Sequence, residues 1–238
     1  MTQTSKSGMA GSLTRAPGFR RRAGLLYSDR VRRLLCYAAA VEAGSLLELD
    51  ADFLCIGVGM ASAAMAITQR LCEQDYDEVL LFGVGGAWPD RLANGGTQQL
   101  AIGSCVLLGS DRFGDLGVTM PEGFESLSAM GIGEDGPWPM DPELTRAAAA
   151  RLGCGTVDAV TVATGSASDP AALELASRTS FGVESMEGAA VALVCQRFGV
   201  PLVQLRCVSN YVGDRAQSQW SLDQACGALQ DAVRALLA

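Results

Sequence analysis

Histidine is absent from the 238-residue sequence. This excludes Ser-His and Cys-His nucleophile systems and removes the commonest protein ligand of transition metals. Carboxylates are therefore the expected acid and base groups of any active site. No cluster of metal ligands and no cofactor motif is visible, so we expect neither a metal ion nor another cofactor.

Long apolar runs and aromatic residues are also scarce. No run of 18 apolar residues occurs, and no apolar segment follows the N-terminal arginines, so neither a membrane span nor a signal peptide is predicted. A composition of 49% hydrophobic residues, 28 glycines and 6% aromatic residues is typical of one compact enzyme domain. We expect a cytoplasmic protein that does not bind membranes.

Basic residues are few outside the N-terminus. Residues 1–33 hold eight Lys and Arg and one acid, which leaves ten basic and twenty-five acidic residues in the remainder. Such an acidic surface repels nucleic acid, so no nucleic-acid partner is expected. Residues 1–32 are predicted to be a basic, disordered extension, with a nucleic-acid arm or a targeting peptide as alternatives, and residues 33–238 to be one domain.

Cysteine pairs at metal-binding or redox spacing are missing as well. The eight cysteines lie mostly in apolar runs, and no two form a CxxC pair. Free buried thiols in a reducing compartment are therefore predicted in preference to disulfides.

Apolar strands and helices alternate from residue 33 onward. The pattern predicts an α/β domain with helices on both faces of a sheet. The segment 98–108 is expected to be a strand or hairpin arm, and 109–141 a loop that acts as a lid, a subunit contact or a plain surface excursion. Strands are predicted at 33–41, 54–58, 78–84, 158–163 and 201–208, and helices at 61–73, 142–152, 171–178 and 186–198, with a last helix running from a Ser221 capping box to Leu237.

Polar residues and glycines lie at the ends of these elements, where open α/β sheets bind ligands. Glu42, the glycines 83–86, Ser166, Glu187 and Asn210 are therefore expected to meet in one pocket. The Gly57-x-Gly59 turn also suits a dinucleotide, but the acid that should close the next strand is missing. A tight strand-to-helix turn is favoured there.

Four motifs resemble those of the purine nucleoside phosphorylase and nucleosidase superfamily. They are GVGMASAA from Gly57, GVGGA from Gly83, VESMEGAA from Val183 and RCVSN from Arg206. The resemblance extends from about Arg33 to the C-terminus. The combination of ESMEGAA with SNYVGDR and a following Trp is most similar to the futalosine hydrolases. These enzymes release hypoxanthine from futalosine in menaquinone biosynthesis. It implies a single-domain three-layer α/β/α sandwich with a central mixed, largely parallel sheet, a small-molecule purine nucleoside as ligand, and a homo-oligomer.

The resemblance also implies roles for individual residues. Met186 packs against the sugar, Glu187 binds the ribose hydroxyls, and Glu42 activates the attacking water. The alternative for Glu187 is a carboxylate that only interacts with the helix dipole, and the alternative for Glu42 is a solvent-exposed acid that opens a helix. The predicted substrate-binding residues are Gly85, Gly86, Ser166, Phe181, Met186 and Glu187, and the predicted catalytic residues are Glu42, Asn210 and Asp214, of which Asp214 either supplies a proton or pairs with Arg215.

Asn210 stands where adenine-specific nucleosidases of the superfamily carry Asp. An amide can donate to O6 of a 6-oxopurine, whereas an ionised Asp would repel it, so hypoxanthine is the expected base. The segments 57–64 and 83–88 contain no Arg, Lys or His to bind phosphate, so water is the expected nucleophile. A phosphorylase, a methylthioadenosine-type nucleosidase and a non-catalytic nucleoside binder remain the alternatives.

Overall fold

The computed structural model describes residues 31–89, 92, 100–214 and 220–238. All but the last two residues of the predicted N-terminal extension lie outside these ranges, so its boundary stays a prediction. Within the described ranges, no helix is both long and apolar enough to cross a bilayer.

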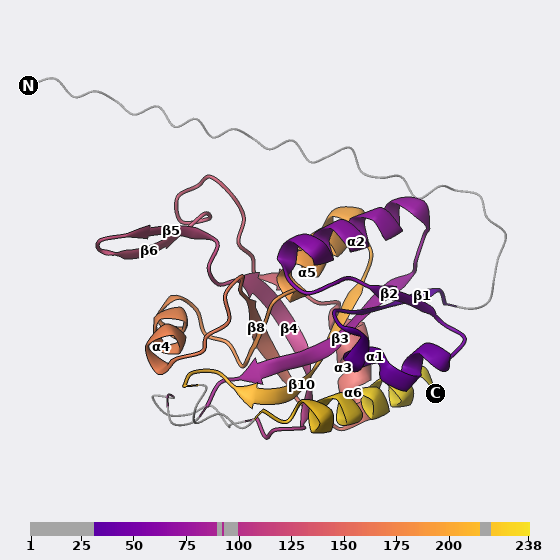
Figure 1. Ribbon diagram of the computed structural model, residues 1–238. Helices are drawn as coiled ribbons and strands as arrows, with labels where there is room; N and C mark the ends of the chain where they lie inside the picture. Colours follow the sequence, from indigo (N-terminus) through magenta and orange to yellow (C-terminus); the bar gives the residue numbers. More distant parts are fainter. Residues whose placement is uncertain (1–30, 90–91, 93–99, 215–219) are drawn as a thin grey trace, which may run out of the picture.

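A mixed sheet forms the centre of the molecule (Figure 1). Its order is β10-β4-β8-β9-β3-β1-β2, with β7 added beside β4, and a further pairing of β3 with β10 closes the five strands β3, β10, β4, β8 and β9 into a ring. Five pairs are parallel, while β4–β10, β3–β9 and β4–β7 are antiparallel, so the predicted mixed, largely parallel sheet is confirmed. The strands are β1 (Arg33–Tyr37), β2 (Asp52–Cys55), β3 (Glu78–Ala87), β4 (Cys105–Phe113), β7 (Trp138–Pro139), β8 (Thr156–Thr161), β9 (Val183–Ser185) and β10 (Leu202–Tyr211).

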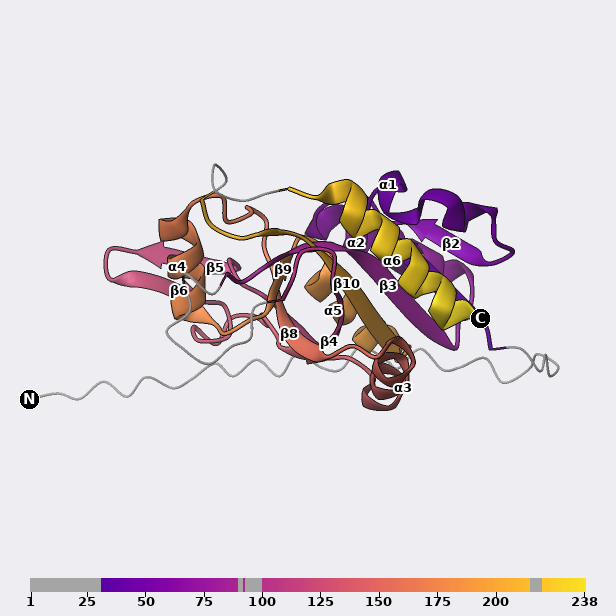
Figure 2. The same ribbon diagram turned by 90° about the horizontal axis from the view of Figure 1, so that it is seen from below.

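Helices cover both faces of the sheet, which confirms the predicted three layers (Figures 1 and 2). On one face lie α2 (Met60–Glu73) and α5 (Gly188–Phe198); on the other lie α1 (Ala40–Ala43), the 3-10 turn Gly44–Glu48, α3 (Pro142–Leu152) and α6 (Leu222–Leu237). Beyond the sheet lie α4 (Asp169–Arg178) and the hairpin of β5 (Gly117–Met120) and β6 (Gly123–Ser126).

Side-chain alternation along β3 explains why this strand is apolar throughout. Leu81 faces the core under α2 and α5, while Leu80 and Phe82 face the core under α6. Successive side chains of a strand point to opposite faces, so a strand covered on both sides needs apolar residues at every position.

Several predicted boundaries were wrong. Strand β1 ends at Tyr37 instead of Val41, because the backbone N–H groups of Ala38 and Ala39 turn to bind the side chain of Glu42, which therefore lies on α1. Strand β10 continues through Tyr211, so Asn210 lies on the strand and not after it.

The segment 109–141 is not a plain loop. It contains the end of β4, the β5–β6 hairpin and β7. Part of the predicted arm at 98–108 lies outside the described residues, and its described end, from Cys105, is the start of β4. The predicted helix 142–152 is confirmed as α3. It begins at this point because the Asp141 side chain accepts hydrogen bonds from two backbone N–H groups of its first turn. The Ser221 capping box is wrong, since its side chain makes no capping hydrogen bond.

Two cysteines differ from the prediction of free thiols. Cys105 on β4 and Cys207 on β10 lie directly opposite in the antiparallel register and form a disulfide. The prediction of buried free thiols is confirmed for Cys36, Cys195 and Cys226. The other free cysteines are less buried: Cys55 and Cys72 are exposed, and Cys154 is half-buried.

Candidate active site

A cavity of about 490 Å³ opens beside the carboxyl ends of β3 and β10. Its size lies within the range of small-molecule sites. It brings together residues from distant parts of the chain, as predicted from their positions at element ends. Seven of the nine predicted site residues line it: Glu42, Gly85, Gly86, Ser166, Met186, Glu187 and Asn210.

The other two predicted site residues do not line this cavity. Phe181 packs edge-on against Trp88, with ring centroids 5.3 Å apart, in a small separate apolar cluster. Asp214 follows Gly213, which does line the cavity, and its backbone N–H donates to Asp169 Oδ1 at 2.8 Å. The roles assigned to Phe181 and Asp214 stay predictions.

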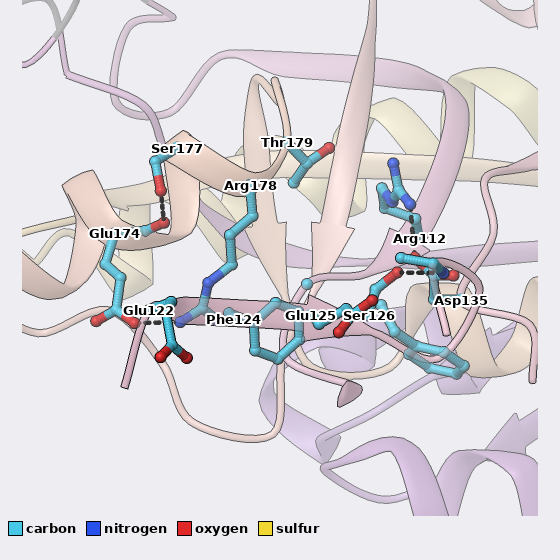
Figure 3. Close-up of a pocket in the computed structure, with 14 residues that line it drawn as sticks. Arg112, Glu122, Phe124, Glu125, Ser126, Asp135, Glu174, Ser177, Arg178 and Thr179 are labelled. Atoms are coloured by element: carbon cyan, nitrogen blue, oxygen red, sulfur yellow. Dashed lines mark hydrogen bonds and ion pairs between the residues drawn. The ribbon is translucent and has the colours of Figure 1, made fainter. Parts of the chain in front are cut away.

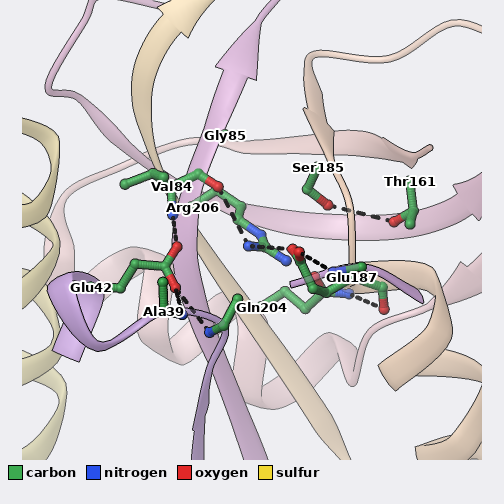
Figure 4. Close-up of polar contacts among 12 residues, drawn as sticks. Ala39, Glu42, Val84, Gly85, Thr161, Ser185, Glu187, Gln204 and Arg206 are labelled. Atoms are coloured by element: carbon green, nitrogen blue, oxygen red, sulfur yellow. Dashed lines mark hydrogen bonds and ion pairs between the residues drawn. The ribbon is translucent and has the colours of Figure 1, made fainter. Parts of the chain in front are cut away.

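Backbone hydrogen bonds hold the carboxylate of Glu42 (Figure 4). Its Oε2 accepts from the N–H groups of Ala38 at 2.9 Å and Ala39 at 3.0 Å, and its Oε1 accepts from Val84 N–H at 2.9 Å. A carboxylate has about four acceptor positions, so three bonds leave one for a water molecule. The residue is 5% exposed, and its carboxylate is held at the edge of the cavity in one orientation.

Glu187 precedes α5 and reaches across to the turn before α2. Its Oε1 accepts from Gly59 N–H at 3.0 Å, where Gly59 has a φ of 93° that only glycine adopts readily. The turn of the GVGM motif therefore positions a carboxylate 128 residues away in the sequence. This contact explains the Gly57-x-Gly59 turn without a bound dinucleotide.

Arg206, a residue without a predicted role, lies between these two glutamates (Figure 4). Its side chain is 1% exposed, and its Nη1 lies 3.9 Å from Glu187 Oε2 and 3.5 Å from the carbonyl of Val84. Within the described part of the chain, its Nε and Nη2 have no hydrogen-bond partner. A charged residue inside a mostly apolar strand was the signal that could have identified it.

Gly83 allows this arrangement. A Cβ atom at this position would lie 2.5 Å from Arg206 Nη1 and 2.8 Å from Glu42 Oε1, so any side chain would separate the two groups. The glycine-rich end of β3 thus has a cation beside it, which the local sequence of 83–88 does not contain. Two carboxylates flank that single cation, and their combined charge would repel a phosphate dianion but not a neutral water molecule.

Asn210 presents its amide to the same cavity. Its Oδ1 accepts from Ser209 Oγ at 2.8 Å, and its Nδ2 donates to the carbonyl of Tyr211 at 3.1 Å. One N–H and one acceptor position of the amide remain for a ligand. The side chain lies over Gly86, where a Cβ would approach Nδ2 to 3.2 Å.

Glu184 is a second cavity residue to which the sequence reasoning gave no role. Its Oε1 accepts from Ser166 N–H at 2.8 Å, and its Oε2 is buried without a partner among the described residues. Burial raises the pKa of Glu184, and its hydrogen bonds with Ser166 oppose that rise.

A buried polar network supports α5 directly behind Glu187. Thr161 Oγ1 donates to Asp111 Oδ1 at 2.9 Å and accepts from Ala189 N–H at 2.8 Å, in the first turn of the helix. Gln204 Nε2 donates to the carbonyl of Gly188 at 3.2 Å. The network therefore fixes the start of the helix that carries Glu187 as its N-cap residue.

Two acceptor oxygens in this network lack a donor. They are Asp111 Oδ2 and Gln204 Oε1, which have no partner in the described ranges and would both clash with a Cβ at Gly188. One proton on Asp111, donated to Gln204 Oε1, would satisfy both oxygens. Burial raises the pKa of Asp111 to about 7, against the lowering effects of Arg206 and Thr161.

A second cavity, of about 460 Å³, lies between the β5–β6 hairpin and α4 (Figure 3). The Arg178 guanidinium stacks over the Phe124 ring at 4.0 Å, and charges of both signs line the walls. It contains none of the predicted site residues. Nowhere in the described ranges do three or more His, Cys, Asp or Glu form a group that could hold a metal ion.

Known proteins are similar to this chain over most of its length. Residues 53–238 match the family model described as the phosphorylase superfamily. Futalosine hydrolase from Thermus thermophilus is 36% identical over 191 residues, which are 78% of this chain and 80% of the relative. Futalosine hydrolase from Streptomyces coelicolor is 35% identical over 189 residues, or 76% of each protein.

Solved structures show the same fold. The 5′-methylthioadenosine/S-adenosylhomocysteine nucleosidase from Colwellia psychrerythraea, in complex with adenine, superposes with a TM-score of 0.72 at 19% identity. The match covers 89% of this chain and 96% of that protein.

Proposed function

This chain belongs to the phosphorylase superfamily, and from that premise we propose that it hydrolyses the N-glycosidic bond of futalosine, releasing hypoxanthine and dehypoxanthine futalosine. The observation that carries the proposal is the position of Arg206 between Glu42 and Glu187. Two carboxylates around one buried cation suit a water nucleophile. The identity with futalosine hydrolases supports the choice of substrate.

In the proposed reaction, Glu42 is the general base. The bond from N9 to C1′ breaks with its electron pair leaving on the base, and the sugar develops oxocarbenium character. Water attacks C1′ and transfers a proton to Glu42, for which a carboxylate suffices because the cationic sugar is a strong electrophile.

Glu187 binds the ribose hydroxyls in this scheme. Its carboxylate accepts their hydrogen bonds and stabilises the positive charge that develops on the sugar ring. Met186 packs against the sugar, and the cavity contains both residues. Because Gly59 N–H already fixes Oε1, the carboxylate is oriented before substrate binds.

Asn210 stabilises the leaving hypoxanthine. Its free N–H donates to O6, and its carbonyl oxygen accepts from N7 once that nitrogen is protonated. The N–H donation to O6 strengthens as negative charge develops on the departing base. From the resemblance we also propose that the protein acts in the cytoplasm as a homo-oligomer.

The test is chromatographic detection of hypoxanthine released from futalosine, with inosine and methylthioadenosine as comparison substrates. We expect release from futalosine that does not depend on phosphate and is abolished in Glu187→Gln. A sugar 1-phosphate formed on addition of phosphate would contradict the hydrolase assignment. Preference for methylthioadenosine would contradict the role of Asn210.

A further inference from the structure

The proposed general base lies on a very short helix. Glu42 belongs to α1, which is four residues long, and the 3-10 turn Gly44–Glu48 follows directly. A helix of this length is not stable on its own, because its few hydrogen bonds do not offset the ordering of the backbone. The position of the Glu42 carboxylate therefore depends on contacts from outside α1.

Helix α6 runs alongside α1 and provides such contacts (Figures 1 and 2). Ala43 and Leu46 are fully buried, and they belong to the same apolar cluster as Ala225 and Leu229 of α6. Apolar packing holds the segment against α6, but it is not directional. Polar contacts are needed in addition to fix the orientation of the segment.

Gln230 of α6 makes polar contacts at both ends of the segment 41–45. Its Nε2 donates to the carbonyl of Val41 at 3.2 Å, and its Oε1 accepts from Ser45 Oγ at 3.3 Å. Ser45 Oγ also accepts from Arg234 Nη2 at 2.8 Å, one turn further along α6. The last carbonyls of a helix have no donor within it, and Gln230 supplies one for Val41. One amide thus contacts the chain on both sides of Glu42.

Gly44 lets this amide approach the backbone closely. Its φ is 46°, and a Cβ there would lie 2.5 Å from Gln230 Nε2 and 2.8 Å from Gln230 Oε1. The amide therefore lies directly over Gly44. A shift of the segment toward α6 would meet the Gln230 side chain, and a shift away from α6 would break its two hydrogen bonds.

We propose that Gln230 is a positioning residue for the reaction, which holds the segment 41–45 so that the Glu42 carboxylate stays within reach of the attacking water. This inference rests on the proposed function, in which Glu42 is the general base. Gln230 does not line the cavity, so it acts through Val41 and Ser45 and not on the ligand.

The residues proposed to bind the base and the sugar are carried by other elements. Asn210 lies on β10, and Glu187 lies at the start of α5. Loss of the Gln230 contacts should therefore impair the attack of water without weakening the binding of hypoxanthine.

Gln230→Glu tests this role without changing the size of the side chain. The variant keeps an acceptor for Ser45 but has no N–H for the carbonyl of Val41. Its kcat for futalosine should fall about tenfold, because a small displacement of a catalytic group is costly, while KM and the calorimetric affinity for hypoxanthine stay within about twofold of wild type. The new carboxylate stands four residues before Arg234, a spacing that supports a helix, so unfolding should need no less urea than in wild type.

Gln224→Glu is the matched control. It introduces the same charge on the same helix, and Gln224 is exposed and outside the cavity, so kcat, KM and hypoxanthine affinity should equal those of wild type. An equal fall of kcat in this control would assign the effect to the added charge and overturn the proposal.

Three further outcomes decide the inference. A Gln230→Glu variant with the kcat of wild type would overturn it. An equal loss of kcat and of hypoxanthine affinity would give Gln230 a general structural role and also overturn it. Wild-type protein that releases no hypoxanthine from futalosine would overturn the proposed function together with this inference, which distinguishes the two failures.

Discussion

Asp111 offers a test of the buried network that does not depend on catalysis. Its pKa rises from an ordinary 3.8 to about 7 because the carboxyl is buried, so the folded protein binds a proton that the unfolded chain releases. The stabilisation is complete below the unfolded pKa and is lost as the pH rises through the folded pKa. A rise of the pKa from 3.8 to about 7 corresponds to about 4 kcal/mol of unfolding free energy.

Asp111→Asn should remove this dependence. The amide can accept from Thr161 through its oxygen and donate to Gln204 Oε1 at every pH, as the protonated carboxyl does. The variant should match wild type at about pH 4 and exceed its unfolding free energy by about 4 kcal/mol above pH 8. Urea unfolding of both proteins, followed by tryptophan fluorescence across this range, measures the difference.

The difference between the two curves isolates Asp111 from the other titrating groups. Arg206 is the charged group that most opposes the raised pKa of Asp111. The competing possibility is therefore an ionised Asp111 that pairs with Arg206. If Asp111 were ionised and paired with Arg206, the amide would destabilise the protein most at high pH. Parallel curves, or a variant that is less stable above pH 7, would refute the shared proton between Asp111 and Gln204.

Two further variants test the catalytic proposal. Glu42→Gln should lower kcat/KM for futalosine by about 10² to 10⁴, because an amide cannot accept the proton from water. Calorimetric binding of hypoxanthine should stay at the wild-type level. Activity within a few fold of wild type would exclude Glu42 as the base. Asn210→Asp should lower cleavage of futalosine about 10-fold to 100-fold, since a carboxylate repels O6. It should also raise the ratio of methylthioadenosine cleavage to futalosine cleavage. An unchanged ratio in the two-substrate assay would show that Asn210 does not select the base.

The sequence by itself determined the type and order of most elements and part of the membership of the cavity. Apolar periodicity and the turn residues marked α2, α3, α5, β3 and β8 to within a few residues. Because parallel strands present their carboxyl ends at one edge of the sheet, residues at element ends could be expected to meet, and Glu42, Ser166, Glu187, Asn210 and two of the glycines line one cavity. The boundaries failed where side-chain contacts end a strand, as Glu42 does at Ala38.

Only the tertiary structure decided which side chains face one another. The placement of Arg206 beside Glu42 depends on the register of β3 against β10. A one-residue shift in register moves a side chain to the other face of the sheet, and nothing within a single strand specifies its partner.

The same limit applies to Phe181 and to the two paired cysteines. Phe181 lies close in sequence to Met186 and Glu187, yet it packs on Trp88 because the antiparallel run of β9 against β3 carries it past the cavity. Cys105 and Cys207 meet although they are 102 residues apart. Local chemistry determined which residues could act at this site, and strand pairing across long stretches of chain decided which of them do so together.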